Sequence, residues 1–154
     1  MYENVDKSKV IVSELWDQKI IENVEVGTFN GLQAIHKYIY QDVFPFAEEL
    51  REVNISKGNF RFASIIFLKS NLEIIDEMKH NSFDEIIEKY FEMNIAHPFR
   101  EGNGRATRIW LDQMLKQNLK LAVDWSVISK DDYLSAMERS PVNSLEIKVS
   151  WKQH

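Results

Sequence analysis

The chain has 154 residues, of which 44% are hydrophobic and 28% are charged, and this length fits one domain. Nine Phe and four Trp supply enough large apolar side chains for a core, which excludes intrinsic disorder. The net charge of −5 argues against nonspecific nucleic-acid binding, and the absence of cysteine excludes disulfides and thiolate metal sites. No apolar run reaches the ~20 residues of a membrane helix, and the N-terminus does not resemble a signal peptide.

Apolar residues recur at helical spacing along most of the chain, which predicts an all-α, compact single-domain bundle. A first, loosely helical segment is expected over residues 8–22. A second helix is expected to be capped by Thr28 and to end before the aromatic turn at Pro45. The spacing predicts that its buried face consists of Leu32, Ile35 and Ile39.

The second half of the chain carries the stronger helical patterns. Residues 64–79 have helical spacing, with an expected apolar stripe of Ile65, Leu68, Leu72, Ile75 and Met78. Ser82 and Glu85 form a capping-box pattern that opens the next helix. A helix over residues 104–118 follows, and two more are expected to begin near Ser129 and Pro141.

One segment departs from the helical pattern. Between residues 51 and 62, Val53 and Ile55 alternate with polar residues, as Phe60 and Phe62 do further on. Lys-Gly-Asn lies between these two runs and is typical of a turn. The segment therefore predicts a short β-hairpin in an otherwise helical chain.

The stretch HPFREGNGRATR, residues 97–108, concentrates residue types that bind phosphate. Its Gly-Asn-Gly sequence opens a predicted helix, where glycines let a ligand approach the backbone. The first N–H groups of a helix have no internal partners and carry partial positive charge, which favours anions. Arg105 and Arg108 lie three positions apart, so both project from the first turns of that helix. Two guanidiniums at a helix N-terminus favour a polyphosphate over a single anion.

His97 and Glu101 add two further functions to this stretch. A neutral imidazole is the usual general base near pH 7, and Mg²⁺ is usually bound by one or two carboxylates together with phosphate oxygens. Each feature alone also has a structural explanation: a turn, a histidine at a helix end, or a solvated arginine pair. Phe99 is expected to anchor the loop in the core.

Taken together, these residues resemble the signature of the Fic family, His-x-Phe-x-[Asp/Glu]-Gly-Asn-Gly-Arg-x-x-Arg, at all eight specified positions. Residues 44–47 resemble the aromatic turn of that family, although a Trp and a Gly are commoner where Phe46 and Glu48 stand. Residues 54–62 resemble its flap hairpin.

The resemblance implies a single Fic domain over residues 1–154, with a core over about 25–140. Its implied activity is protein adenylylation, in which AMP moves from Mg-ATP to a Tyr, Thr or Ser hydroxyl and pyrophosphate leaves. His97 would be the general base for the hydroxyl, and Glu101 would bind Mg²⁺. The phosphates of ATP would be bound by Gly102, Asn103, Gly104, Arg105 and Arg108.

Five further residues are assigned by the same resemblance. Asn94, one turn before the histidine, would face the nucleotide, and Lys57 in the hairpin would reach ATP from the other side. Asn59, Phe60 and Arg61 would form a flap edge that pairs with an extended segment of the target protein. The expected target is a bacterial housekeeping protein or the chain itself.

The alternatives differ in the group that is transferred. Transfer of UMP, GMP or phosphocholine, or removal of AMP, would use the same phosphate-binding residues, because these residues do not contact the base. The branch of the family that transfers phosphate has Lys where Gly104 stands here, so that activity is disfavoured. A non-catalytic interaction module is the third alternative.

Regulation is expected to come from outside this sequence. Many family members carry an inhibitory helix with the pattern Ser/Thr-x-x-x-Glu-Gly/Asn, whose Glu pairs with the second arginine of the signature. Glu22-Asn23 matches the end of that pattern, but Gln18 occupies its first position. We therefore expect a missing C-terminal helix or a separate antitoxin to cover Arg108. The expected location is the bacterial cytoplasm or a cell into which the protein is delivered, without membrane or direct nucleic-acid contact.

Overall fold

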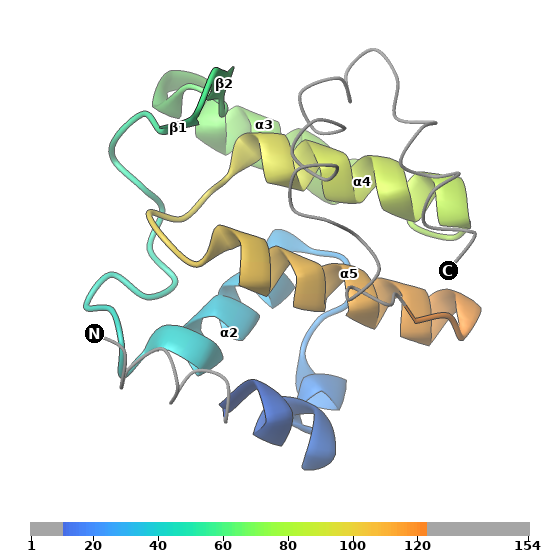
Figure 1. The fold of residues 1–154 in the computed structure, drawn as a ribbon. Helices are drawn as coiled ribbons and strands as arrows, with labels where there is room; N and C mark the ends of the chain where they lie inside the picture. Colours follow the sequence, from blue (N-terminus) through green and yellow to red (C-terminus); the bar gives the residue numbers. More distant parts are fainter. Residues whose placement is uncertain (1–10, 123–154) are drawn as a thin grey trace.

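The computed structural model describes residues 11–122, which form helices joined by loops and one small hairpin (Figure 1). Residues 11–17 are helical and are followed by the 3-10 helix η1 (Ile20–Asn23). Within the described range, the loosely helical segment expected over residues 8–22 thus consists of two separate helical pieces. Lys19 interrupts it, because its φ of 59° is left-handed and cannot continue an α-helix.

Helix α2 (Phe29–Tyr40) begins at the predicted cap. The Thr28 hydroxyl accepts a hydrogen bond from the Gly31 N–H at 3.0 Å, and the Thr28 carbonyl accepts one from Trp110 Nε1 at 3.0 Å. The start of α2 is thus tied to a distant helix as well as capped locally. The predicted buried face is confirmed, since no part of Leu32, Ile35 or Ile39 is exposed.

Helices α3 (Ile65–Glu77) and α4 (Phe83–Ala96) agree with the predicted pattern. Ser82 and Glu85 form the reciprocal capping box that the sequence predicts. The apolar stripe predicted for α3 is only partly correct. Leu68, Leu72 and Ile75 are buried, whereas Ile65 in the first turn is 36% exposed. Helix α3 packs against α4 and α2.

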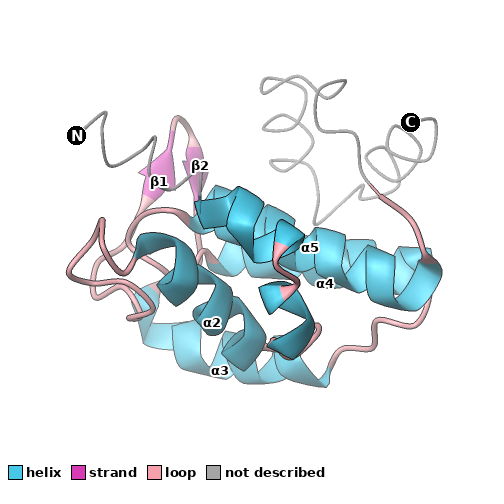
Figure 2. Cartoon of the chain, turned by 90° about the horizontal axis from the view of Figure 1, so that it is seen from below, coloured by secondary structure: helices cyan, strands magenta, loops and turns pink. Residues whose placement is uncertain are grey.

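Helix α5 (Asn103–Leu119) is central to the bundle and packs against both α2 and α4. Figures 1 and 2 show that the loop between α4 and α5 lies at the same end of the molecule as the long loop after α2. The buried residues of α5 include Trp110, Leu111, Met114 and Leu115. Because α5 is buried on two sides, its N-terminal turn has a fixed position.

The predicted hairpin is present but short. Strands β1 (Ser56–Lys57) and β2 (Phe60–Arg61) pair antiparallel, and they project from one end of the bundle (Figure 2). Val53 lies outside the ladder and is 47% exposed, so the strand expected from residue 51 onward is too long. Leu50 instead forms an isolated antiparallel bridge with Phe99.

The helices expected near Ser129 and Pro141 lie outside the described residues. Within residues 11–122, no helix is both long and apolar enough to cross a membrane.

Candidate active site

His97 stands at the junction between α4 and the stretch that is predicted to bind phosphate. It is the C-terminal cap of α4, with φ 48° and ψ 63°, and its N–H donates to the Met93 carbonyl at 2.9 Å. Non-glycine residues rarely adopt the left-handed backbone conformation, and those that do are often found at functional sites. The imidazole lies parallel to the Phe62 ring, with centroids 3.7 Å apart and an interplanar angle of 13°. The end of the hairpin thus covers one face of the ring.

The imidazole of His97 is held in its neutral form. Burial, together with the positive charges of Lys57 and Arg51, lowers its pKa to about 3, while the Asn94 carbonyl acts in the opposite direction. Nδ1 is buried and has no hydrogen-bond partner of standard geometry among the described residues. We assign the proton of the neutral ring to the buried Nδ1, which leaves Nε2 as the acceptor.

Arg51 joins the loop that begins at His97 to the base of the hairpin. Arg51 is 4% exposed, and its guanidinium donates to the carbonyls of His97 at 2.6 Å and Ala96 at 2.9 Å. It also donates to the carbonyls of Val53 at 2.7 Å and Ala63. The last carbonyls of a helix lack internal partners, so a cation here stabilises the end of α4. The same side chain therefore fixes the backbone of His97 and both sides of the hairpin base.

Buried side chains stabilise the loop between α4 and α5. Phe99 is fully buried, which confirms the predicted anchor. Asn103, 3% exposed, accepts from the Phe99 N–H at 2.7 Å and donates to the Phe99 carbonyl at 2.6 Å. Both ends of the Asn103 amide are thus used within the loop. A contribution of Asn103 to phosphate binding would therefore come from its backbone N–H.

His36 connects this loop to the loop that follows α2. Its Nε2 donates to the Glu101 carbonyl at 2.8 Å, and its Nδ1 accepts from the Glu48 N–H at 2.9 Å. These partners fix one neutral tautomer, because an N–H can only donate and a carbonyl can only accept. The ring is fully buried and stacks on Phe99 at 3.9 Å, and burial lowers its pKa.

The N-terminus of α5 is open toward the two arginines. Gly102 caps the helix with φ 79° and, as a glycine, supplies no side-chain cap for the first N–H groups. A Cβ on Gly104 would lie 3.9 Å from Arg108 Nη2, so this guanidinium lies beside the first turn. Both Arg105 and Arg108 lower the pKa of the Tyr40 hydroxyl electrostatically, which places two positive charges near one point. This arrangement suits a ligand with several negative oxygens.

The remaining predicted residues occupy different positions around His97. Glu101 is exposed, and its carboxylate has no ion pair or hydrogen bond among residues 11–122. Asn94 is buried one turn before His97 and donates to the Tyr90 carbonyl at 3.0 Å. Lys57 is exposed in β1 and close enough to affect the His97 imidazole electrostatically. Their predicted roles toward ATP stay predictions.

The flap residues Asn59 and Arg61 are exposed, and Phe60 between them is half-buried. The Phe60 ring meets Phe62 edge to face at 5.0 Å. An aromatic series therefore runs from the flap to the His97 imidazole. Docking of a target segment at this edge also stays a prediction.

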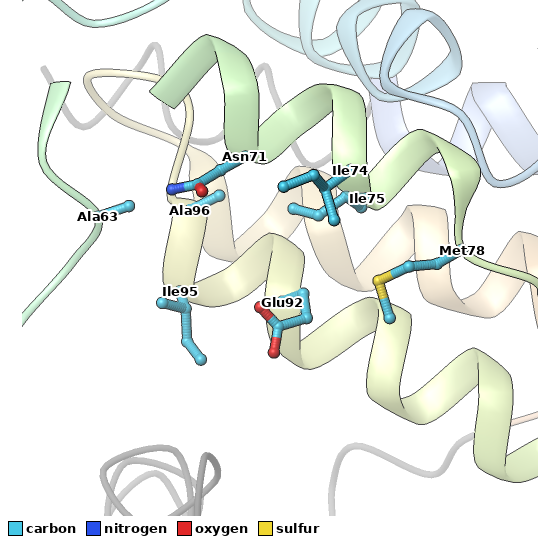
Figure 3. Close-up of a pocket in the computed structure, with 8 residues that line it drawn as sticks. All are labelled: Ala63, Asn71, Ile74, Ile75, Met78, Glu92, Ile95 and Ala96. Atoms are coloured by element: carbon cyan, nitrogen blue, oxygen red, sulfur yellow. The ribbon is translucent and has the colours of Figure 1, made fainter. Parts of the chain in front are cut away.

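A cavity of about 430 Å³ lies between α3 and α4 (Figure 3). It is lined by Ala63, Asn71, Ile74, Ile75, Met78, Glu92, Ile95 and Ala96. Burial and the nearby Glu88 raise the pKa of Glu92. The described lining residues include none of the predicted phosphate-binding or catalytic residues. The predicted site residues therefore do not line this cavity.

A profile of the Fic/DOC family matches residues 28–115, more than half of the chain. The chain belongs to the Fic/DOC family. The match extends from the Thr28 cap into α5 and includes His97, Glu101 and both arginines of this Fic domain. The resemblance noted from the sequence is thus confirmed.

Curated relatives carry names that refer to adenylyl transfer. The Fic chain is 32% identical over 125 residues to "Probable protein adenylyltransferase Fic" of Salmonella typhimurium and 30% identical to the Escherichia coli protein of the same name. Each alignment covers 74% of this chain and 62% of the relative. The chain therefore spans about three fifths of the length of these relatives.

Solved Fic structures confirm the fold. The BepC protein of Bartonella tribocorum, solved with bound AMPPNP, matches with a TM-score of 0.73 at 18% identity, over 99% of this chain and 86% of that one. The N-terminal FIC domain of Bep8 from Bartonella sp. 1-1C matches with a TM-score of 0.78 at 14% identity, over 98% and 82%. The expected helical bundle with a flap hairpin is therefore correct.

Sequence reasoning missed three residues that support the site: His36, Tyr40 and Arg51. His36 and Tyr40 are the buried polar side chains near the end of α2, and Arg51 lies in the loop that follows. The spacing of His36 and Tyr40 relative to Ile35 and Ile39 places them beside the apolar face, which was the available signal. Nothing local distinguishes Arg51 from a surface arginine.

Proposed function

We propose that this Fic domain is a protein adenylyltransferase that transfers AMP from ATP to a hydroxyl side chain of a protein. The observation that carries the proposal is the combination of a neutral His97 imidazole with two guanidiniums grouped at the start of α5. The imidazole accepts a proton, and the two guanidiniums bind the leaving phosphates. The names of the curated relatives support the same reaction.

In the proposed reaction, Nε2 of His97 accepts the proton of a Tyr, Thr or Ser hydroxyl. The hydroxyl oxygen forms a bond to the α-phosphorus of ATP, and the bond from that phosphorus to the pyrophosphate oxygen breaks. The pyrophosphate leaves with additional negative charge. Backbone N–H groups of residues 102–104, together with Arg105 and Arg108, act where that charge develops. General base catalysis of this kind contributes about 10²–10⁴-fold.

The Glu101 carboxylate fits a magnesium ion that is shared with the nucleotide. It is exposed next to the anion-binding turn, and residues 11–122 contain no group of three or more His, Asp or Glu side chains that could bind a metal alone. Mg²⁺ typically keeps one or two protein carboxylates and takes phosphate oxygens as its other ligands. When bound, the ion would neutralise phosphate charge during transfer.

Nucleotide binding also adjusts the proposed base. A pKa of about 3 makes His97 a weak base in the protein without nucleotide. The phosphates bring negative charge that opposes Lys57 and Arg51, and negative charge favours the imidazolium. We infer that Lys57 and Asn94 contact the nucleotide. The phosphates of that nucleotide would then lie close enough to the His97 imidazole to raise its pKa.

The flap provides a surface for the target protein. Each strand of the two-stranded hairpin has one unpaired edge, and Asn59 and Arg61 are exposed there. An extended target segment can pair with such an edge through backbone hydrogen bonds. This mode binds the backbone, so it places a hydroxyl near His97 without requiring one target sequence.

Inhibition by a carboxylate from another helix is consistent with the position of Arg108. The Arg108 side chain is exposed, so a glutamate of a separate protein or of an additional segment could reach it. Such a pair would occupy a cation that the proposed reaction uses for phosphate.

The test is transfer of radiolabel to protein in a bacterial lysate, with Mg²⁺ present. Labelling is counted as the increase over the same lysate without this protein. We expect an increase from ATP labelled at the α-phosphate and none from ATP labelled at the γ-phosphate. His97→Ala should reduce the increase by about 10²–10⁴-fold without changing the fold measured by circular dichroism. An increase from the γ-phosphate, or an equal increase with the variant, would contradict the proposal. Parallel reactions with α-labelled GTP and UTP test the other nucleotidyl transfers.

A further inference from the structure

Tyr40, the last residue of α2, lies directly against the N-terminus of α5. A Cβ on Gly102 would be 2.4 Å from Cε2 and 2.8 Å from Cζ of this tyrosine. The side chain is 6% exposed and stacks on Phe44, with centroids 5.0 Å apart. His36 packs against the ring at 4.9 Å. The ring is therefore held from several sides and has no room to turn away from α5.

The hydroxyl of Tyr40 is engaged by the phosphate-binding arginines. The Arg105 guanidinium lies within hydrogen-bonding range of this hydroxyl, and Arg108 is close enough to act on it electrostatically. Burial nevertheless raises the pKa of this hydroxyl above its ordinary value, so it is uncharged at neutral pH. An uncharged oxygen accepts a hydrogen bond from a guanidinium without cancelling its charge. A carboxylate in the same place would hold the arginine more tightly but would compete with phosphate.

We propose that Tyr40 is a positioning residue that orients the Arg105 guanidinium toward the β-phosphate of the nucleotide. The proposal rests on the proposed function, because it takes the ligand of Arg105 to be a phosphate of ATP. Ring contacts hold Tyr40, and the absence of a Cβ at Gly102 leaves the space in which the Tyr40 ring lies. The Tyr40 hydroxyl in turn holds the Arg105 guanidinium. Preorganisation of this kind lowers the cost of ordering a long side chain when the ligand binds.

The test compares ADP with AMP in Tyr40→Phe, which keeps the ring and removes only the hydroxyl. With Mg²⁺ present, isothermal titration calorimetry should give an ADP affinity about 3- to 10-fold weaker than in the unmodified protein. The AMP affinity should change less than 2-fold, because AMP has no β-phosphate. Tyr38→Phe, a half-buried tyrosine of the same helix, is the matched control and should change neither affinity. Equal weakening of ADP and AMP in Tyr40→Phe would overturn the proposal.

A double-mutant cycle separates this inference from the proposed function. Arg105→Ala should weaken ADP binding, and adding Tyr40→Phe to it should have no further effect, because the two residues act together. If Arg105→Ala weakens ADP binding while Tyr40→Phe has an independent or no effect, the positioning role is wrong and the proposed function stands. If Arg105→Ala leaves ADP binding unchanged, the phosphate role of Arg105 itself is wrong. Melting temperatures of all variants without ligand identify any loss of folding, and the cycle can then be repeated at lower temperature.

Discussion

The imidazole of His97 lies flat on the phenyl ring of Phe62, the residue that follows β2. The flap and the proposed base are therefore in direct contact before any substrate binds. Arg51 reinforces this contact, because it bonds the His97 carbonyl and the carbonyls on both sides of the hairpin base. A change at the flap is transmitted to the proposed base through packing and through these hydrogen bonds.

Replacing Gly102 with alanine should be far more damaging than the same change at Gly58. Both glycines have positive φ, 79° and 57°, so alanine costs about 1 kcal/mol at each from backbone strain. At Gly102 the new Cβ also overlaps the Tyr40 ring, whereas at Gly58 nothing lies within 4 Å. We expect Gly102→Ala to lower the unfolding free energy by about 2–4 kcal/mol. Equal decreases of the unfolding free energy in Gly102→Ala and Gly58→Ala, measured by urea unfolding, would show that the contact with the Tyr40 ring is unimportant.

Replacing His36 with phenylalanine should destabilise the protein and reduce its sensitivity to acid. The variant keeps a ring against Phe99 but leaves the Glu48 N–H and the Glu101 carbonyl without partners, at a cost of about 2–4 kcal/mol at pH 7. Lys37→Gln, an exposed change on the same helix, should alter stability by less than ~0.5 kcal/mol.

The pH effect follows from the lowered pKa of His36. Below about pH 6.5 the unfolded chain binds a proton that the folded state resists, so the stability present above that pH is lost as the pH falls. This residue contributes up to ~1.4 kcal/mol per pH unit, until its own lowered pKa is reached. Urea unfolding at pH 7, 6 and 5 should show a shallower pH dependence in His36→Phe. An unchanged slope would contradict the neutral, buried state of His36.

Replacing Arg51 with lysine should destabilise the loop that carries His97. Lysine keeps the positive charge, but one ammonium cannot reach four carbonyls as the guanidinium fork does. We expect an unfolding free energy lower by about 2–4 kcal/mol and a large loss of transfer activity. Arg100→Lys, an exposed neighbour of the same loop, should stay within ~0.5 kcal/mol. Full stability in Arg51→Lys would rule out the structural role of the fork.

Removing the charge of Lys57 should raise the pKa of His97. Lys57 is the second cause of the low value, after burial, and its positive charge disfavours the imidazolium. In Lys57→Gln the midpoint of the His97 Cε1–H chemical shift, followed by NMR, should move to higher pH from about 3. Lys69→Gln on α3 is the control and should leave this midpoint unchanged. A midpoint that does not move in Lys57→Gln would place its ammonium outside the range of the ring.

At Glu48, glycine should be more stable than alanine. The residue has φ 63°, which costs a side chain about 1 kcal/mol and costs glycine little. Both variants lose the 3.6 Å ion pair with Lys37, which is exposed and contributes little. We therefore expect the unfolding free energy of Glu48→Gly, measured by thermal or urea unfolding, to be about 1 kcal/mol higher than that of Glu48→Ala. The opposite order would show that the strain is relieved elsewhere in the loop.

Local signals account for what could be predicted from the sequence. Helix caps such as Thr28 and Ser82 act within four residues, so their effect is visible in the sequence itself. The motif from His97 to Arg108 is likewise contiguous, and its resemblance to a family supplied roles that spacing alone leaves open. The length of the hairpin was overestimated because alternation does not reveal where a partner strand ends.

Contacts between distant segments account for what was missed. Arg51 donates to carbonyls that lie 45 and 46 positions away in the sequence, and His36 donates to a carbonyl 65 positions away. Neither pairing has a periodicity or a motif that one sequence displays. Glu48 illustrates the same limit, since its departure from the family pattern was visible but its left-handed backbone was not.

The open turn at Gly58 has a practical consequence. Nothing described lies within 4 Å of a side chain placed there, so additional residues can extend outward from the hairpin. Doubling the length of a flexible loop costs only about 0.6 kcal/mol in closure entropy. A peptide ligand for a chosen protein could therefore be grafted into this turn, and the proposed transferase could be redirected toward a new client without alteration of residues 97–108.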